Sequence, residues 1–99
     1  MTAVQLKASD SGTVSIVGTL SFDNVTSLLD ESMSMFDGKS VLKFDLEAVD
    51  KSDSAGLALL IEWMSLATKK GQSVSFVNLP KQMLDIASVS GLNEVLPLA

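Results

Sequence analysis

The stretch FDLEAVDKSDSAGLALL, residues 44–60, decides the fold class of this chain. Around its start, apolar residues 42, 44 and 46 alternate with polar ones, as in a strand whose successive side chains point to opposite faces. A polar loop is predicted over residues 47–52, and an apolar helix then starts near Ser54. A strand that leads into a long helix indicates an α/β domain.

The predicted helix that starts near Ser54 has recognisable signals at both ends. Asp53 or Ser54 can accept a hydrogen bond from the free N–H groups of the first turn. Lys69 and Lys70 suit the negative end of the helix dipole, and Gly71 is the expected C-cap. The helix therefore ends at residue 71.

The rest of the chain completes the α/β pattern. Alternation around residues 4–8 and 14–16, with turn residues 10–12 between, predicts a β-hairpin. Helical spacing over residues 22–36 predicts a helix with Ser21 as N-cap, residues 74–77 a short strand, and Pro80 the start of a third helix. We expect one domain over residues 1–99, with an N-terminal β-hairpin followed by alternating helices and strands in a mixed sheet.

Composition argues against several function classes. The chain has no His and no Cys, so it lacks the usual general base, the thiol nucleophile and the common zinc ligands. A net charge of −5 points away from nucleic acid, and no glycine-rich phosphate loop is present. The acids of residues 45–53 predict a solvated loop more than a cation site. We expect a protein that is not an enzyme and has no metal or cofactor.

The sequence also bears on location. The first eight residues lack the apolar core of a signal peptide, and no apolar run approaches the length of a membrane span. We therefore expect a cytoplasmic protein without direct membrane insertion.

The helix from Ser54 carries more apolar surface than one sheet can cover. One stripe contains Leu57, Leu60 and Met64, while Leu59, Trp63 and Leu66 are displaced from it. Either the other helices cover this second stripe, or part of it is a protein-binding face with Trp63 as an aromatic anchor. The sequence leaves both interpretations open.

The junction of Asp53 and Ser54 also has two interpretations. A capping role alone explains both residues, whereas a phosphorylated Ser54 hydroxyl would be favoured by the helix dipole and opposed by the nearby acids. Gly56 similarly suits either the close approach of a partner or packing against a neighbouring strand.

The order of elements and residues 44–60 resemble a STAS domain over nearly the whole chain. This family of interaction modules includes bacterial anti-sigma factor antagonists, the cytoplasmic tails of sulfate transporters and the MlaB subunits of a phospholipid ABC transporter. Its Asp-Ser-Ser-Gly-Leu pattern is found here as Asp53-Ser54-Ala55-Gly56-Leu57.

The departure from the family pattern is at Ala55. In the sigma-regulating branch the phosphorylated hydroxyl lies just before the glycine, where this chain has no hydroxyl. Ser54 matches the position at which MlaB-like proteins carry Thr or Ser in the surface that meets their ATPase. The resemblance is thus greatest to the MlaB group.

That resemblance implies a non-catalytic subunit that binds and regulates or stabilises the ATPase of a phospholipid-transporting ABC complex with its permease. The complex would maintain outer-membrane lipid asymmetry, and this subunit would lie in the cytoplasm, peripheral to the inner membrane. The expected partner-binding residues are the first turn and one flank of the helix: Asp53, Ser54, Ala55, Gly56, Leu57, Leu59, Glu62 and Trp63.

Two alternatives remain at this stage. An anti-sigma factor antagonist could bind its anti-sigma kinase without a phosphorylation switch. A hydrolase built on Ser54 would need a base that a chain without His does not offer in its usual form.

Overall fold

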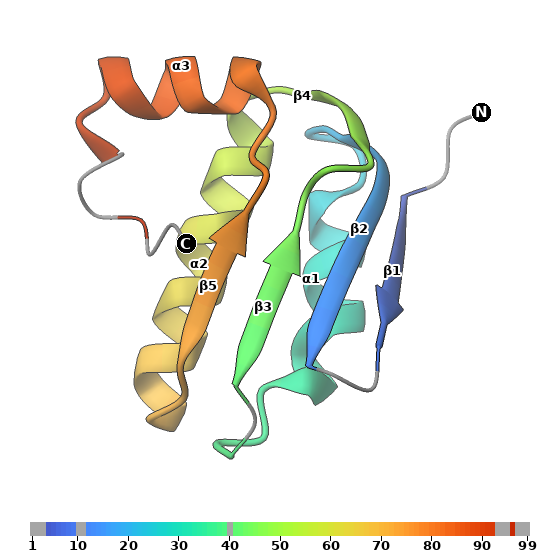
Figure 1. The fold of residues 1–99 in the computed structure, drawn as a ribbon, viewed down its shortest axis with the longest axis vertical. Coiled ribbons are helices and arrows are strands. Elements are labelled where there is room, and N and C mark those ends of the chain that lie inside the picture. Colours follow the sequence, from blue (N-terminus) through green and yellow to red (C-terminus); the bar gives the residue numbers. More distant parts are fainter. Residues whose placement is uncertain (1–3, 10–11, 40, 93–95, 97–99) are drawn as a thin grey trace.

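A mixed β-sheet with two helices on one face forms the body of the protein (Figure 1). The computed structural model describes residues 4–9, 12–39, 41–92 and 96. The strands are β1 (Gln5–Ala8), β2 (Thr13–Leu20), β3 (Leu42–Asp45), β4 (Val49–Ser52) and β5 (Val74–Val77). The helices are α1 (Val25–Ser32), a 3-10 turn η1 (Met33–Met35), α2 (Ser54–Lys70) and α3 (Lys81–Val89).

The sheet has the order β1-β2-β3-β5. The predicted hairpin is confirmed, since β1 pairs antiparallel with β2 and Leu6 lies opposite Ile16. The pairs β2–β3 and β3–β5 are parallel, with Phe44 of β3 between Val14 and Phe76. The mixed α/β sheet expected from the sequence is therefore confirmed.

Residues 49–52 form strand β4, so the loop predicted over residues 47–52 is wrong for this part. The eight-residue strand β2 pairs with β3 along its first half and with β4 along its second, where Gly18 lies opposite Val49. Asp50 and Lys51 are exposed, and four residues are too few to show alternation. Only pairing with β2 makes this polar segment a strand.

Helix α1 is shorter than the predicted helix over residues 22–36. Residues 21–24 form a turn in which the Asn24 side chain accepts a hydrogen bond from the Ser21 N–H and donates to the Thr19 carbonyl. The helix begins at Val25 with Asn24 as N-cap, so the assignment of Ser21 as the cap is wrong. Phe22 therefore lies in the loop before α1 and is not part of the helix.

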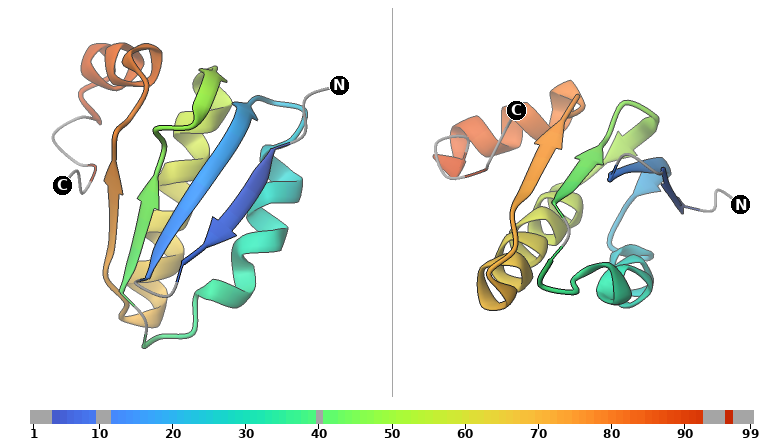
Figure 2. Two further views of the ribbon diagram at one scale, coloured as in Figure 1. Left: turned by 45° about the vertical axis from the view of Figure 1, so that its right-hand side comes forward. Right: turned by 60° about the horizontal axis from the view of Figure 1, so that its bottom comes forward.

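The core lies between the sheet and the pair of helices α1 and α2, which lie side by side on the same face (Figure 2). Trp63 of α2 stacks on Phe44 with ring centroids 4.0 Å apart and an angle of 4° between the rings. Its Nε1–H donates a 2.7 Å hydrogen bond to Ser32 Oγ on α1. This buried aromatic stack joins both layers of the domain.

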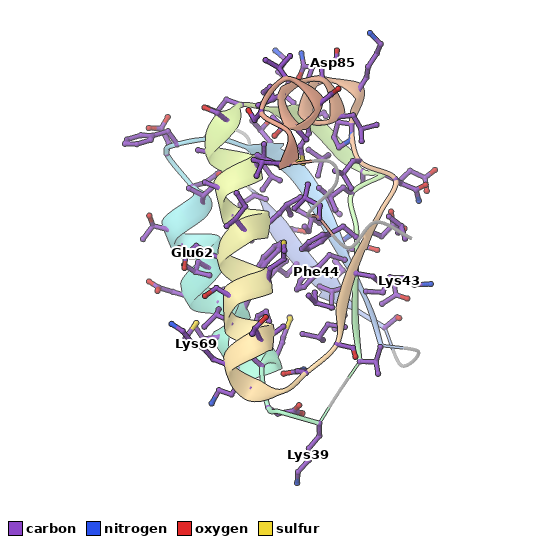
Figure 3. The ribbon with its side chains drawn as sticks, turned by 90° about the vertical axis from the view of Figure 1, so that its left-hand side faces the viewer. Lys39, Lys43, Phe44, Glu62, Lys69 and Asp85 are labelled. Carbon is purple, nitrogen blue, oxygen red and sulfur yellow. The ribbon has the colours of Figure 1, made fainter. Side chains whose placement is uncertain are left out.

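The two sides of the sheet differ in character. Figure 3 shows Glu62 and Lys69 on the helical side, Phe44 between the layers and Lys43 on the opposite side of the sheet.

Helix α3 crosses the end of the sheet and contributes the buried Met83 and Ala87 to the core. At the far end of α2, Gly71 has a φ of 66°, a left-handed conformation that confirms the predicted C-cap.

Candidate functional site

Asp53 ties the start of α2 to two neighbouring segments. One carboxylate oxygen accepts a 2.9 Å hydrogen bond from the Ala55 N–H, and the other accepts a 3.3 Å bond from the Phe22 N–H. The Asp53 N–H donates to the Leu20 carbonyl at the end of β2. The N-cap is therefore Asp53, while the side chain of Ser54, the first helical residue, is exposed.

Gly56 and Leu57 face the interior of the protein and pack beneath the first turn of α2. A Cβ atom on Gly56 would collide with Ser52 Oγ and lie 3.1 Å from Leu20 Cβ and 3.2 Å from Met83 Cε. Leu57 is likewise buried in the core. Of the two interpretations of Gly56, the structure supports close internal packing, since no room for a partner backbone exists there.

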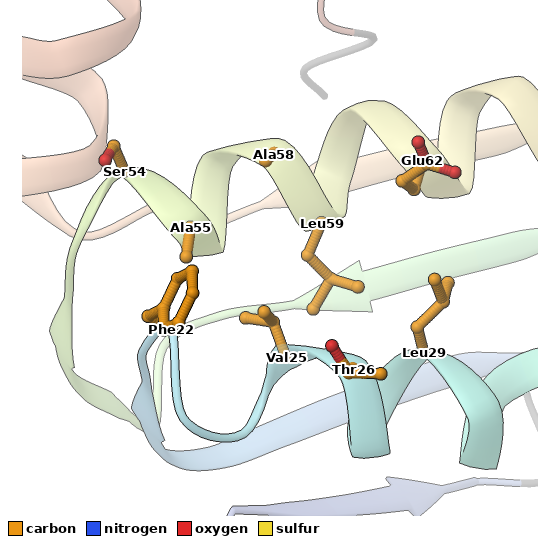
Figure 4. A pocket seen from close by; sticks show the side chains of 9 residues that line it. All are labelled: Phe22, Val25, Thr26, Leu29, Ser54, Ala55, Ala58, Leu59 and Glu62. Atoms are coloured by element: carbon orange, nitrogen blue, oxygen red, sulfur yellow. The ribbon is translucent and has the colours of Figure 1, made fainter.

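An open groove of about 430 Å³ lies between α1 and the first half of α2 (Figure 4). Its volume is near the lower end of the range of about 300–1,000 Å³ that is common for ligand pockets. The lining side chains are mostly apolar and come from both helices and the loop before α1: Phe22, Val25, Thr26, Leu29, Ser54, Ala55, Ala58, Leu59 and Glu62. We call this the α1–α2 groove.

Phe22 lies at one end of the α1–α2 groove and is 81% exposed. Figure 4 shows its ring beside Ala55, while the Ser54 side chain points away from the ring. The hydrogen bond from the Phe22 N–H to Asp53 holds this loop against the first turn of α2. The exposed aromatic residue of the site is thus Phe22, for which helical spacing predicts a place in the helix.

Four of the eight predicted contact residues are buried: Gly56 and Leu57, described above, and also Leu59 and Trp63. Trp63 is completely buried, and Leu59 is only 3% exposed and forms part of the groove wall. The expectation that Trp63 is an exposed anchor is therefore wrong, because its ring packs on Phe44 and Phe76 of the sheet and α1 supplies Ser32 as a partner for the indole nitrogen. Glu62 is exposed and borders the groove, as expected.

The site offers a binding surface and little chemistry. Ser54 has no imidazole to activate it, since the chain contains no His. Within the described parts of the chain, no cluster of acidic side chains could hold a metal ion, and no helix could cross a membrane. What the groove combines is apolar surface, an exposed aromatic ring and the start of a helix.

Comparison with known protein families identifies the chain. The family model described as the MlaB STAS domain matches residues 4–97. The chain belongs to the STAS family. Members of this family are typically non-catalytic regulatory proteins. None of the curated proteins compared with this STAS domain matches it.

Solved structures share the fold. An anti-sigma factor antagonist from Mycobacterium paratuberculosis has a TM-score of 0.74 at 20% identity, covering 99% of this chain and 85% of its own. The antagonist SpoIIAA in its unphosphorylated form has a TM-score of 0.73 at 20% identity, covering 98% and 88%. The murine Solute Carrier 26 family member A9 anion transporter has a TM-score of 0.67 at 22% identity, with 88% of this chain matched to 16% of the transporter.

Proposed function

We propose that this STAS domain is a non-catalytic subunit that binds the ATPase of a phospholipid-transporting ABC complex. The observation that carries the proposal is the match of the MlaB STAS model to residues 4–97, in a chain that has Ala55 where the sigma-regulating branch has its phosphorylated hydroxyl. The subunit would then lie on the cytoplasmic side of the inner membrane through its complex, and the complex would support outer-membrane lipid asymmetry.

The docking surface consists of the exposed part of the α2 start and the α1–α2 groove. Ser54, Ala58 and Glu62 recur at intervals of four residues, so they share one face of the helix. Phe22 extends this surface beyond the helix. Four other predicted residues have an indirect role, since they hold the first turn of α2 and the groove wall in position. They are Asp53, Gly56, Leu57 and Leu59.

The groove alone is too small for a stable interface, which commonly buries about 800 Å² on each partner. A partner must therefore also cover the exposed side of α2 or the loop around Phe22. A regulatory effect would require that the partner ATPase exposes this binding surface better in one of its conformational states than in another.

The alternative function is that of an anti-sigma factor antagonist. Its support is the fold of the antagonists from Mycobacterium paratuberculosis and of SpoIIAA, which this chain shares over nearly its whole length. With Ala55 at the switch position, such an antagonist would bind an anti-sigma kinase constitutively. Phosphorylation of Ser54 instead would add charge one residue from Asp53.

Affinity purification of the tagged protein from its native cells in mild detergent, followed by mass spectrometry, separates these functions. An ABC ATPase with its permease is the expected result, and Ser54→Arg should remove both. Ser88→Arg is the matched control, because Ser88 is an exposed serine on α3. Recovery of an anti-sigma kinase would establish the alternative, and unchanged recovery of the ATPase with Ser54→Arg would refute this docking surface.

A further inference from the structure

The charges around the α1–α2 groove are of one sign. Glu62 lines the groove itself. Asp30 lies one turn after Thr26, so it shares the face of α1 that borders the groove. Asp23 follows Phe22 directly, and Asp53 binds the Phe22 N–H.

No basic side chain balances these acids in the sequence segments that form the groove. The chain has no Lys or Arg between Lys7 and Lys39, and the first basic residue of α2 is Lys69. Lys69 lies about two helical turns from Glu62, toward the C-terminal end of α2. Lys51 lines a separate hollow of about 220 Å³ with Thr19 and Gln82. The part of the groove near the start of α2 is therefore apolar with an acidic border.

We infer that the α1–α2 groove binds a basic, apolar segment of a protein partner. One bulky aliphatic or aromatic side chain would enter between Leu29 and Ala58, and flanking Lys or Arg residues would meet Asp30 and Glu62. The inference rests on the proposed function in so far as this face is the docking surface, and it adds the chemistry of the segment that docks there.

Charge also decides against the other occupants of an apolar groove. A second copy of this chain, with its net charge of −5, would bring further acidic residues to an acidic border. Nucleic acid and an anionic lipid surface would be repelled for the same reason. The open groove of about 430 Å³ fits one or two side chains of a partner. The surrounding acidic residues then favour partners with basic residues on either side of the inserted side chain.

The test is selection of peptides from a random 12-residue library displayed on phage, with the full chain immobilised. The wild type should enrich peptides in which Lys or Arg flank Leu, Ile or Phe. Synthetic copies should bind Glu62→Lys and Asp30→Lys at least tenfold more weakly, and their affinity for the wild type should fall as NaCl is raised from about 50 to 500 mM.

Glu31→Lys is the matched control. It makes the same change of charge on α1, but Glu31 lies about 200° around the helix from Leu29 and is exposed. Its peptide affinity should stay within about twofold of the wild type. Failure to enrich basic peptides, or equal losses in Glu31→Lys and Glu62→Lys, would overturn the inference.

This outcome is separable from failure of the proposed function. If purification from cells recovers the ATPase and Ser54→Arg removes it, while the library yields no basic peptides, the docking surface stands and only the chemistry assigned to its occupant is wrong. If basic peptides bind and no ATPase is recovered, the groove binds as inferred and the proposed partner is wrong.

Discussion

Replacement of Trp63 by Ala should strongly destabilise the domain, because this indole is the centre of the core. Trp63 is fully buried, stacks on Phe44 at 4.0 Å between centroids and donates to Ser32 Oγ. Truncation of a buried Trp to Ala costs about 3–5 kcal/mol. Domains of this size have unfolding free energies of about 5–15 kcal/mol, so the loss is about 30–50% of a mid-range value of about 10 kcal/mol.

Trp63→Phe should cost much less. The smaller ring can retain the stack on Phe44, while the hydrogen bond to Ser32 is lost. Ser32 Oγ keeps its 2.8 Å bond to the Leu29 carbonyl, so no buried hydroxyl is left without a partner. A lost hydrogen bond of this kind costs about 0.5–1.5 kcal/mol, and the smaller ring adds a further loss from its reduced volume.

The measurements are thermal and urea denaturation, both followed by circular dichroism at 222 nm, since Trp63 is the single Trp of the chain and its removal abolishes indole fluorescence. Trp63→Ala should lower the midpoint of thermal unfolding by about 12–20 °C, at about 4 °C per kcal/mol for a domain of this length. Glu62→Ala, one residue earlier and exposed, should change the unfolding free energy by less than about 0.5 kcal/mol.

A loss below about 1 kcal/mol in Trp63→Ala would refute the buried position of the indole. Fluorescence of the unmodified protein gives an independent check, because a buried indole should emit at short wavelength and resist quenching by iodide. Any loss of partner binding in Trp63→Ala would report unfolding, so Ser54 and Glu62 are the residues with which to test docking.

Three further predictions follow from the start of α2. Gly56→Ala should destabilise the domain by about 1 kcal/mol in urea unfolding. Overpacking costs about 1–3 kcal/mol, and the better helix propensity of Ala offsets up to about 1 kcal/mol of this cost. A variant more stable than the wild type would contradict the close contacts of Gly56 with Leu20 and Met83. Asp53→Ala should lose about 1–2 kcal/mol by the same assay, and Asp53→Asn should recover most of it, whereas equal losses would show that the cap is not the cause. If the transporter function holds, deletion of the gene should sensitise cells to detergent, and Ser54→Arg should fail to restore resistance where the wild type succeeds.

The elements with strong local signals were predictable. The ends of α2 follow from Asp53 and Gly71, whose roles depend on a few neighbouring backbone groups. The β1–β2 hairpin follows from alternation around a short turn. By contrast, β4 has four mostly polar residues, and its strand geometry depends on the distant partner β2.

The site divides in the same way. The motif at residues 53–57 and the exposed Glu62 could be read from the sequence, whereas the burial of Trp63 and the exposure of Phe22 could not. Helical spacing assigns Phe22 to the helix that follows, because periodicity does not reveal that the Asn24 side chain holds residues 21–24 in a turn. The groove exists only where this turn and α1 meet α2.

The sequence by itself determined the α/β class, the start and end of the long helix, the STAS resemblance and the lack of a hydroxyl at Ala55. These properties depend on residue identity and on short-range backbone chemistry. Only the tertiary structure decided that Trp63 is enclosed between the sheet and α1, that Gly56 packs inward and that the exposed aromatic ring belongs to Phe22. Burial depends on which distant elements are brought together, and a helix with two apolar stripes does not encode which of them its neighbours will cover.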